Sequence, residues 1–244
     1  MPVKRMAVSS LVLAALVLSA VMLPTSAQAK PPAPGGSQSS SAASITCNLP
    51  ESNAEALEIL SNYYPGYWWD HAHLTIAVQA APNVSARQLQ AIHTAIDTWS
   101  RVLADCFDGA ITLTNVTGAQ KNKRKGVDIV LHYVPKAGGV SFDGYAICGA
   151  HRCPNILVRS DIPPKIAYDP QYVGWVTLHE IGHALGLGHT TNLWESTDLM
   201  GYGWPDLGDP VLSQCDIEGI AFVFAWVFEG SAPHRPAEGP FVCS

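Results

Sequence analysis

The feature that most constrains this chain is the run at residues 179–189, which reads His-Glu-Ile-Gly-His-Ala-Leu-Gly-Leu-Gly-His. His179 and His183 are four positions apart, so on an α-helix both imidazoles leave the same face, one turn apart. That spacing suits two nitrogen ligands of one tetrahedral zinc ion, which bind at about 2.0–2.1 Å. Because glycine tolerates positive φ, a helix can end at Gly186 and return His189 towards the same metal. Three protein ligands leave one coordination position for water, which is typical of a catalytic zinc site.

Glu180 follows the first of these histidines and is the predicted general base for that water. A His-x-x-x-His pair alone also occurs on solvated helix faces and in buried cores. Here the full pattern fixes five positions out of eleven, and the apolar, helix-compatible run 172–178 precedes it. The combination favours a catalytic zinc on a buried helix.

The same residues resemble a known family. The pattern His-Glu-x-x-His-x-x-Gly-x-x-His with a later methionine is similar to that of the metzincin metalloproteases. Residues 198–202 supply the matching Met-turn, with its methionine at Met200. Thr190, directly after the third histidine, resembles the Ser or Thr of the matrixin branch, and residues 212–220 resemble the opening of the last matrixin helix. The resemblance extends from about residue 67 to residue 228.

The resemblance implies both a fold and an activity. The expected fold is α+β and zincin-like: a twisted mixed sheet packed on a long helix and an active-site helix, with a smaller subdomain after the Met-turn. The expected activity is that of a secreted zinc endopeptidase with one catalytic Zn²⁺ per chain and a protein or peptide substrate. Met200 would form an apolar floor under the imidazoles.

The segment 141–151 resembles the matrixin loop and edge strand that bind calcium and substrate. The resemblance makes Asp143 a candidate calcium ligand. It suggests as candidate substrate-binding residues Ile147, Gly149, Ala150 and Tyr202. The His-x-Asp pair that precedes this loop in matrixins is replaced by Pro-Lys-Ala-Gly-Gly at 135–139, which argues against a second, structural zinc.

The two ends of the chain have a different character from its middle. Lys4 and Arg5, an apolar run at 11–23 and an Ala-Gln-Ala site at 27–29 predict a signal peptide over residues 1–29. The apolar run is too short for a membrane span, which needs about 20 residues. The remaining domains predicted are a linker and short leader at 30–65, a catalytic domain at 66–230 and a tail at 231–244.

Charge and cysteine content limit the partners. Loss of the signal peptide takes the formal charge from −6 to −8, which argues against nucleic acid as a partner. We expect a monomer.

Six cysteines in an exported chain predict disulfides. Fifteen pairings exist and the sequence cannot choose among them, although we favour Cys148–Cys153, Cys215–Cys243 and Cys47–Cys106. Matrixins are typically kept latent by a free cysteine in a Pro-Arg-Cys-Gly segment, but the surroundings of Cys47 lack that pattern.

Two other function classes fit the same motif. One is a non-peptidase zinc amidohydrolase, and the other is a zinc-containing binding module without turnover. The presence of Glu180 beside the ligands argues against the second, because a purely structural site needs no base.

Periodicity predicts the secondary structure. Alternating apolar residues predict strands at 73–79, 111–116, 127–134 and 155–160. Three- and four-residue spacing predicts a helix from 85 to about 102, and apolar residues at mixed spacing predict a short helix at 51–64. An acidic cap followed by a proline predicts that the active-site helix begins at about 169, and an apolar run predicts a closing helix at 211–228. We expect the tail after Gly230 to be anchored only through Cys243.

Overall fold

A computed structural model describes residues 47, 49–50, 56–58, 67–82, 84–119, 126–134, 143–149, 151–159, 170–191, 198–201, 212–237 and 239–243. All of them fall in the second of two compact units of the chain, residues 39–244. The predicted signal peptide, Ala150 and Tyr202 lie outside the described residues. The predicted domain boundaries therefore remain predictions.

The centre of the fold is one mixed sheet of five strands in the order β2-β1-β3-β5-β4. Four strands run parallel: β1 (His73–Ala80), β2 (Thr112–Asn115), β3 (Ile129–Val134) and β5 (Asn155–Arg159). β4 (Gly144–Ile147) pairs antiparallel with β5 and forms one edge of the sheet. The four strands predicted from alternation are present, with bounds that differ by up to two residues.

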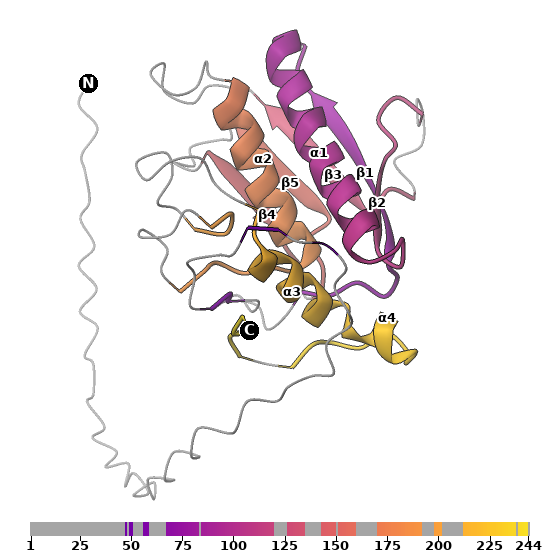
Figure 1. Cartoon of the computed structure of the whole chain (residues 1–244). Coiled ribbons are helices and arrows are strands. Elements are labelled where there is room, and N and C mark those ends of the chain that lie inside the picture. Colours follow the sequence, from indigo (N-terminus) through magenta and orange to yellow (C-terminus); the bar gives the residue numbers. More distant parts are fainter. Residues whose placement is uncertain are drawn as a thin grey trace, which may run out of the picture. The chain divides into compact units, whose positions relative to one another are not determined.

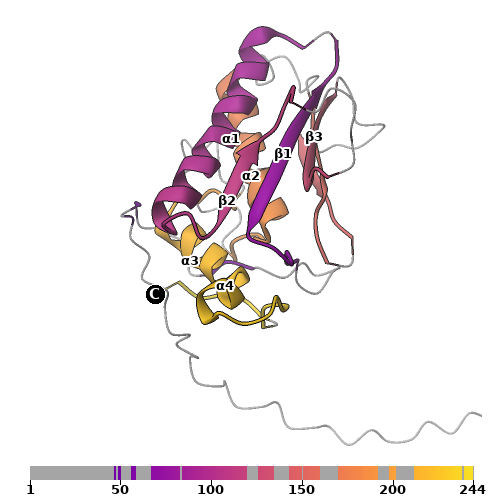
Figure 2. The same ribbon diagram turned by 90° about the vertical axis from the view of Figure 1, so that its right-hand side faces the viewer.

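Two helices lie against the same face of this sheet, as Figures 1 and 2 show. Helix α1 (Ala86–Cys106) begins with a capping box, in which Ser85 Oγ accepts from the Gln88 backbone N–H and the Gln88 side chain accepts from the Ser85 N–H. The largest side chains of its buried face are Ile92, Ile96, Trp99 and Leu103, all fully buried. Helix α2 (Pro170–Leu185) packs alongside α1 and carries the histidine motif.

Two buried tryptophans hold α2 in place. Trp99 Nε1 donates to the carbonyl of Leu178 at 2.9 Å, and Trp69 Nε1 donates to the carbonyl of Ala184 at 2.8 Å. A buried Trp N–H needs a partner, so both rings are fixed in register with the helix. The helix that carries the site is therefore anchored near both the first ligand and its own end.

The chain closes with α3 (Gln214–Val223) and the short helix α4 (Ala225–Glu229), so the single helix predicted at 211–228 is wrong. Phe224 lies between them with φ −102° and ψ 23°, outside helical dihedrals, and its side chain is fully buried. Local periodicity does not show this break. No helix among the described residues has the length and apolar composition to cross a membrane.

The predicted helix at 51–64 is wrong where the structure describes it. Leu57 is extended and forms antiparallel bridges with Thr190 and with Phe241. Phe241 also packs against Phe222, with ring centroids 5.3 Å apart, so Cys243 is not the only anchor of the tail. These long-range backbone bonds override the local helical preference.

The disulfides confirm the favoured pairing, with bonds between Cys47 and Cys106, Cys148 and Cys153, and Cys215 and Cys243. No cysteine is free, and all six belong to the described residues.

Candidate metal centre

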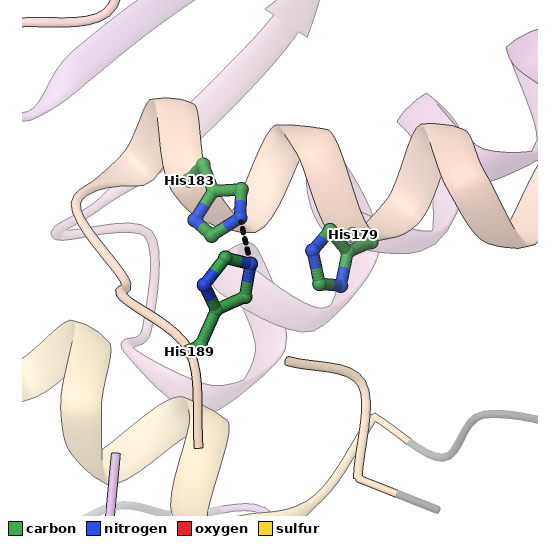
Figure 3. A group of neighbouring side chains, drawn as sticks. All are labelled: His179, His183 and His189. Carbon is green, nitrogen blue, oxygen red and sulfur yellow. Dashed lines mark hydrogen bonds between the residues drawn. The ribbon is translucent and has the colours of Figure 1, made fainter. Parts of the chain in front are cut away.

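The three histidines of the motif meet at one point. Figure 3 shows His179 and His183 projecting from successive turns of α2, with His189 approaching from the extended segment that follows. One nitrogen from each ring lies within 4.8 Å of the others. Nε2 of His183 and Nε2 of His189 are 3.0 Å apart. Among the described residues this is the only group of three or more potential metal ligands from His, Cys, Asp and Glu.

Backbone carbonyls fix how two of the rings are protonated. His179 Nδ1 donates to the carbonyl of Leu199 at 2.7 Å, and His183 Nδ1 donates to the carbonyl of Leu187 at 2.8 Å. Because a carbonyl only accepts, each Nδ1 carries the hydrogen and each Nε2 keeps its lone pair. The lone-pair nitrogens are thus the ones available for a metal.

Burial keeps these imidazoles uncharged. Desolvation, followed by the neighbouring histidines, holds the pKa of His179 well below its usual range. Desolvation lowers the pKa of His183 to about 4 and that of His189, with a further contribution from His183, to about 3. Neutral imidazole is the metal-binding form, so the site does not have to lose protons at neutral pH.

Gly186 makes the turn that brings the third histidine in. It has φ +117°, and a Cβ at this position would lie 2.7 Å from Val223 Cγ1. Both its conformation and its packing against α3 therefore require glycine.

Met200 lies directly against the helix between the first two histidines. It is fully buried, and a Cβ built at Gly182 would lie 2.6 Å from Met200 Sδ. The missing side chain of Gly182 therefore makes room for the methionine.

Glu180 is buried beside the edge strand β4. Its carboxylate accepts a hydrogen bond from the backbone N–H of Ala146, which opposes the effect of burial, yet desolvation still raises its pKa from 4.5 to about 8. A Cβ built at Gly144 would lie 2.6 Å from Glu180 Cγ and 2.6 Å from its Oε1, so only glycine allows this approach. Glu180 Oε2 is buried and has no hydrogen-bond partner in the part of the chain that the structure describes.

The donor set and this orphaned oxygen fit a zinc ion with an associated water. Three neutral imidazoles are a known catalytic zinc set, and their carbonyl-bonded Nδ1 atoms match the usual support of metal-bound histidines. A buried carboxylate oxygen without a partner is costly unless it has a polar partner in the functional state.

A buried polar cluster holds the Met-turn against α3. Asp198 accepts from the Met200 N–H at 3.2 Å and from Ser213 Oγ at 2.8 Å. Ser213 is the N-cap of α3, and Asp216 completes its capping box. Burial, followed by the charge of Asp198, raises the pKa of Asp216 well above its usual range. The cluster fixes the loop whose Leu199 carbonyl orients His179.

The remaining candidate residues do not join the histidines. Asp143 Oδ2 accepts a hydrogen bond from the Tyr172 hydroxyl at 2.6 Å. Among the described residues Asp143 belongs to no group of potential metal ligands, so the predicted calcium site is not supported. Ile147 ends β4, and Gly149 follows it with its N–H bonded to the Arg152 carbonyl at 2.9 Å.

Sequence reasoning missed the supporting groups. The carbonyls of Leu187 and Leu199 belong to the backbone, so the residue types at these positions do not indicate their role. Gly144 lies in the segment that resembles a calcium-binding loop, and nothing in the sequence indicates its contact with Glu180. Asp198 was visible as an unusual charge in an apolar turn, and that charge was the one available signal.

Comparison with known proteins agrees with this geometry. A family model described as matrixin matches residues 67–225. Interstitial collagenase of Sus scrofa is 28% identical over 186 residues, which cover 72% of this chain and 36% of that protein. Matrix metalloproteinase-16 of Homo sapiens is 27% identical over 188 residues, covering 70% of this chain and 30% of that protein. The chain thus spans about a third of the length of these curated relatives.

Among solved structures, high choriolytic enzyme 1, a hatching enzyme zinc-protease from Oryzias latipes, is similar with a TM-score of 0.30 and 16% identity over 50% of each chain. A TM-score of this size adds nothing to the assignment. The family match covers more than half of the sequence and includes all three histidines, so the chain belongs to the matrixin family, as its motifs predicted.

Proposed function

We propose that this chain is a secreted zinc-dependent endopeptidase in which Glu180 is the general base. The observation that carries the proposal is the buried carboxylate with an unpartnered oxygen, next in sequence to a cluster of three neutral imidazoles. His179, His183 and His189 would hold the metal. Zinc in such a site polarises a carbonyl and lowers the pKa of its water from 15.7 to about 7.

Glu180 performs the proton transfers. At Oε2 it accepts a proton from the attacking water and then delivers it to the departing amine of the cleaved peptide. Its two oxygens are unequal, because the Ala146 N–H holds the carboxylate in place while Oε2 stays unpaired among the described residues.

The edge strand β4 is the proposed binding site for an extended substrate. Within the described sheet it pairs only with β5, so its other edge can accept a peptide strand. Tyr145 is 50% exposed and Ile147 is 39% exposed on this strand, which favours apolar side chains along the bound peptide. The disulfide between Cys148 and Cys153 braces the turn after β4.

Secretion is supported by two features. The first 29 residues have the pattern of a signal peptide. The three disulfides suit an oxidising compartment, because such bonds are rare in the cytosol.

The test is Glu180→Gln, which keeps shape and hydrogen bonding but cannot take up the proton. General-base assistance is worth about 10²–10⁴-fold, or roughly 3–5.5 kcal/mol of barrier. We expect unchanged zinc content and at least a ~100-fold loss in cleavage of a quenched peptide. Glu229→Gln, which removes an exposed carboxylate facing His234, is the matched control and should keep full activity.

Two results would count against the proposal. A Glu180→Gln protein that cleaves at the wild-type rate would exclude Glu180 as the base. A zinc-loaded wild-type protein that cleaves small amides but no protein substrate would instead identify an amidohydrolase.

A further inference from the structure

Three extended segments, distant in sequence, meet beside the third histidine. They are residues 56–58, residues 190–191 and Phe241, here called the clip. Leu57 and Phe241 exchange two backbone hydrogen bonds of 2.8 and 2.9 Å. On the opposite side of the segment 56–58, the Ala56 carbonyl accepts a hydrogen bond from the Thr191 N–H at 3.2 Å. The clip is therefore a small antiparallel ladder with residues 56–58 as its middle strand.

The clip bonds directly to a predicted metal ligand. The Glu58 N–H donates to the carbonyl of His189 at 2.7 Å. Beyond it, the Thr190 N–H donates to the carbonyl of Met200 at 3.2 Å. His179 and His183 are held by α2 itself, whereas His189 lies outside any helix and depends on these flanking bonds.

The side chain of Leu57 adds packing under the same turn. It is fully buried, and a Cβ built at Gly219 of α3 would lie 2.9 Å from Leu57 Cδ1 and 2.8 Å from Leu187 Cδ2. Leu187 is the residue whose carbonyl orients His183. Leu57 and Leu187, which belongs to the turn that carries the chain from α2 to His189, therefore both pack against α3 at Gly219.

Disulfides anchor the chain on either side of two parts of the clip, residues 56–58 and Phe241. The bond between Cys47 and Cys106 ties the leader to the end of α1, and the bond between Cys215 and Cys243 ties the tail to α3. The Gln214 N–H also donates to the Pro50 carbonyl at 2.9 Å. Such cross-links reduce the entropic cost of holding remote segments together.

We propose that residues 56–58 are a permanent positioning element of the metal centre: their backbone holds His189 in place, and they stay attached in the active protein. This inference rests on the proposed function for its zinc site, but it concerns metal binding and not turnover.

The experiment compares Glu58→Pro with Glu58→Ala. Proline removes the N–H that bonds His189, whereas alanine changes the side chain and leaves that N–H in place. A backbone hydrogen bond contributes about 1 kcal/mol, so we expect Glu58→Pro to weaken zinc binding roughly five- to tenfold and Glu58→Ala to leave it within about twofold. Affinity is measured by competition with a chromophoric chelator, and the visible absorption of Co²⁺-loaded protein reports the coordination geometry.

Both variants are also made with Glu180→Gln, so that the comparison does not depend on catalysis. If Glu58→Pro binds zinc as tightly as the wild type and has an unchanged Co²⁺ spectrum, residues 56–58 do not position His189, and the proposed function is unaffected. A wild-type protein that binds zinc but cleaves no peptide would refute the proposed function and leave this comparison valid. A wild type that binds no zinc overturns both.

A second measurement covers the case in which Glu58→Pro does not fold. N-terminal sequencing and intact mass of the secreted, active protein should find Cys47 and residues 56–58 still present. A fully active form that begins after Glu58 and has lost the leader would overturn the proposal.

Discussion

Replacing Gly144 with alanine should displace the proposed base while leaving the metal ligands untouched. A Cβ at this position would lie 2.6 Å from Glu180 Cγ, 2.6 Å from Glu180 Oε1 and 2.6 Å from Val176 Cγ1. Non-bonded carbon atoms prefer about 3.5–4.0 Å, so strand β4 or the Glu180 side chain must move by about 0.9 Å or more. Val176 and Glu180 both belong to α2, which the tryptophan bonds hold in place.

The magnitude follows from that displacement. A shift of about 1 Å in a reacting group can cost ~100-fold in rate, and overpacking typically costs about 1–3 kcal/mol of stability. We therefore expect Gly144→Ala to lower kcat/KM about 100-fold and to lower the melting temperature, with zinc content unchanged. Quenched-peptide kinetics, thermal unfolding and metal analysis on one preparation measure all three.

A matched control and a double variant separate the two effects. The control is Gly174 on α2, where a Cβ would meet only the Ala91 carbonyl at 3.7 Å and Ala91 Cβ at 3.8 Å, so Gly174→Ala should keep full activity. In the Glu180→Gln background, Gly144→Ala should add little further loss, because both changes act on one group. A Gly144→Ala protein with wild-type kcat/KM would refute the reasoning.

Two further predictions concern buried carboxylates. In metal-free protein, burial raises the pKa of Glu180 from 4.5 to about 8, so stability should fall by roughly 3–6 kcal/mol as the pH rises through this range. Metal-free Glu180→Gln, measured by thermal unfolding at a series of pH values, should lose much less stability over this pH range than the metal-free wild type. Equal losses of stability in the two proteins would contradict the prediction. Asp198→Ala leaves the Met200 N–H without its acceptor and removes the nearer of the two acceptors of the Ser213 hydroxyl, which keeps Asp216 Oδ2 at 3.1 Å. This change should cost about 1–3 kcal/mol in urea unfolding, whereas Asp198→Asn keeps one carbonyl oxygen for the Met200 N–H and should cost less. Equal stability of these two variants would exclude the acceptor role.

Local sequence was sufficient wherever a single element decides the outcome. The four-residue spacing of His179 and His183 puts both rings on one helix face, and Gly186 supplies the positive φ that ends the helix. Ser85 and Gln88 form their capping box within one turn of chain. Such patterns depend only on the backbone geometry of nearby residues, so they can be predicted without knowledge of the fold.

Contacts between distant segments could not be predicted in this way. Leu57 lies in a stretch with helical composition, but Thr190 and Phe241 offer its backbone a ladder, and the ladder prevails. The need for glycine at position 144 comes from Glu180, which is distant in sequence but adjacent in space. The sequence therefore determined which side chains could bind a metal. The tertiary structure decided what holds them, because backbone carbonyls and amides bond according to position and not according to residue type.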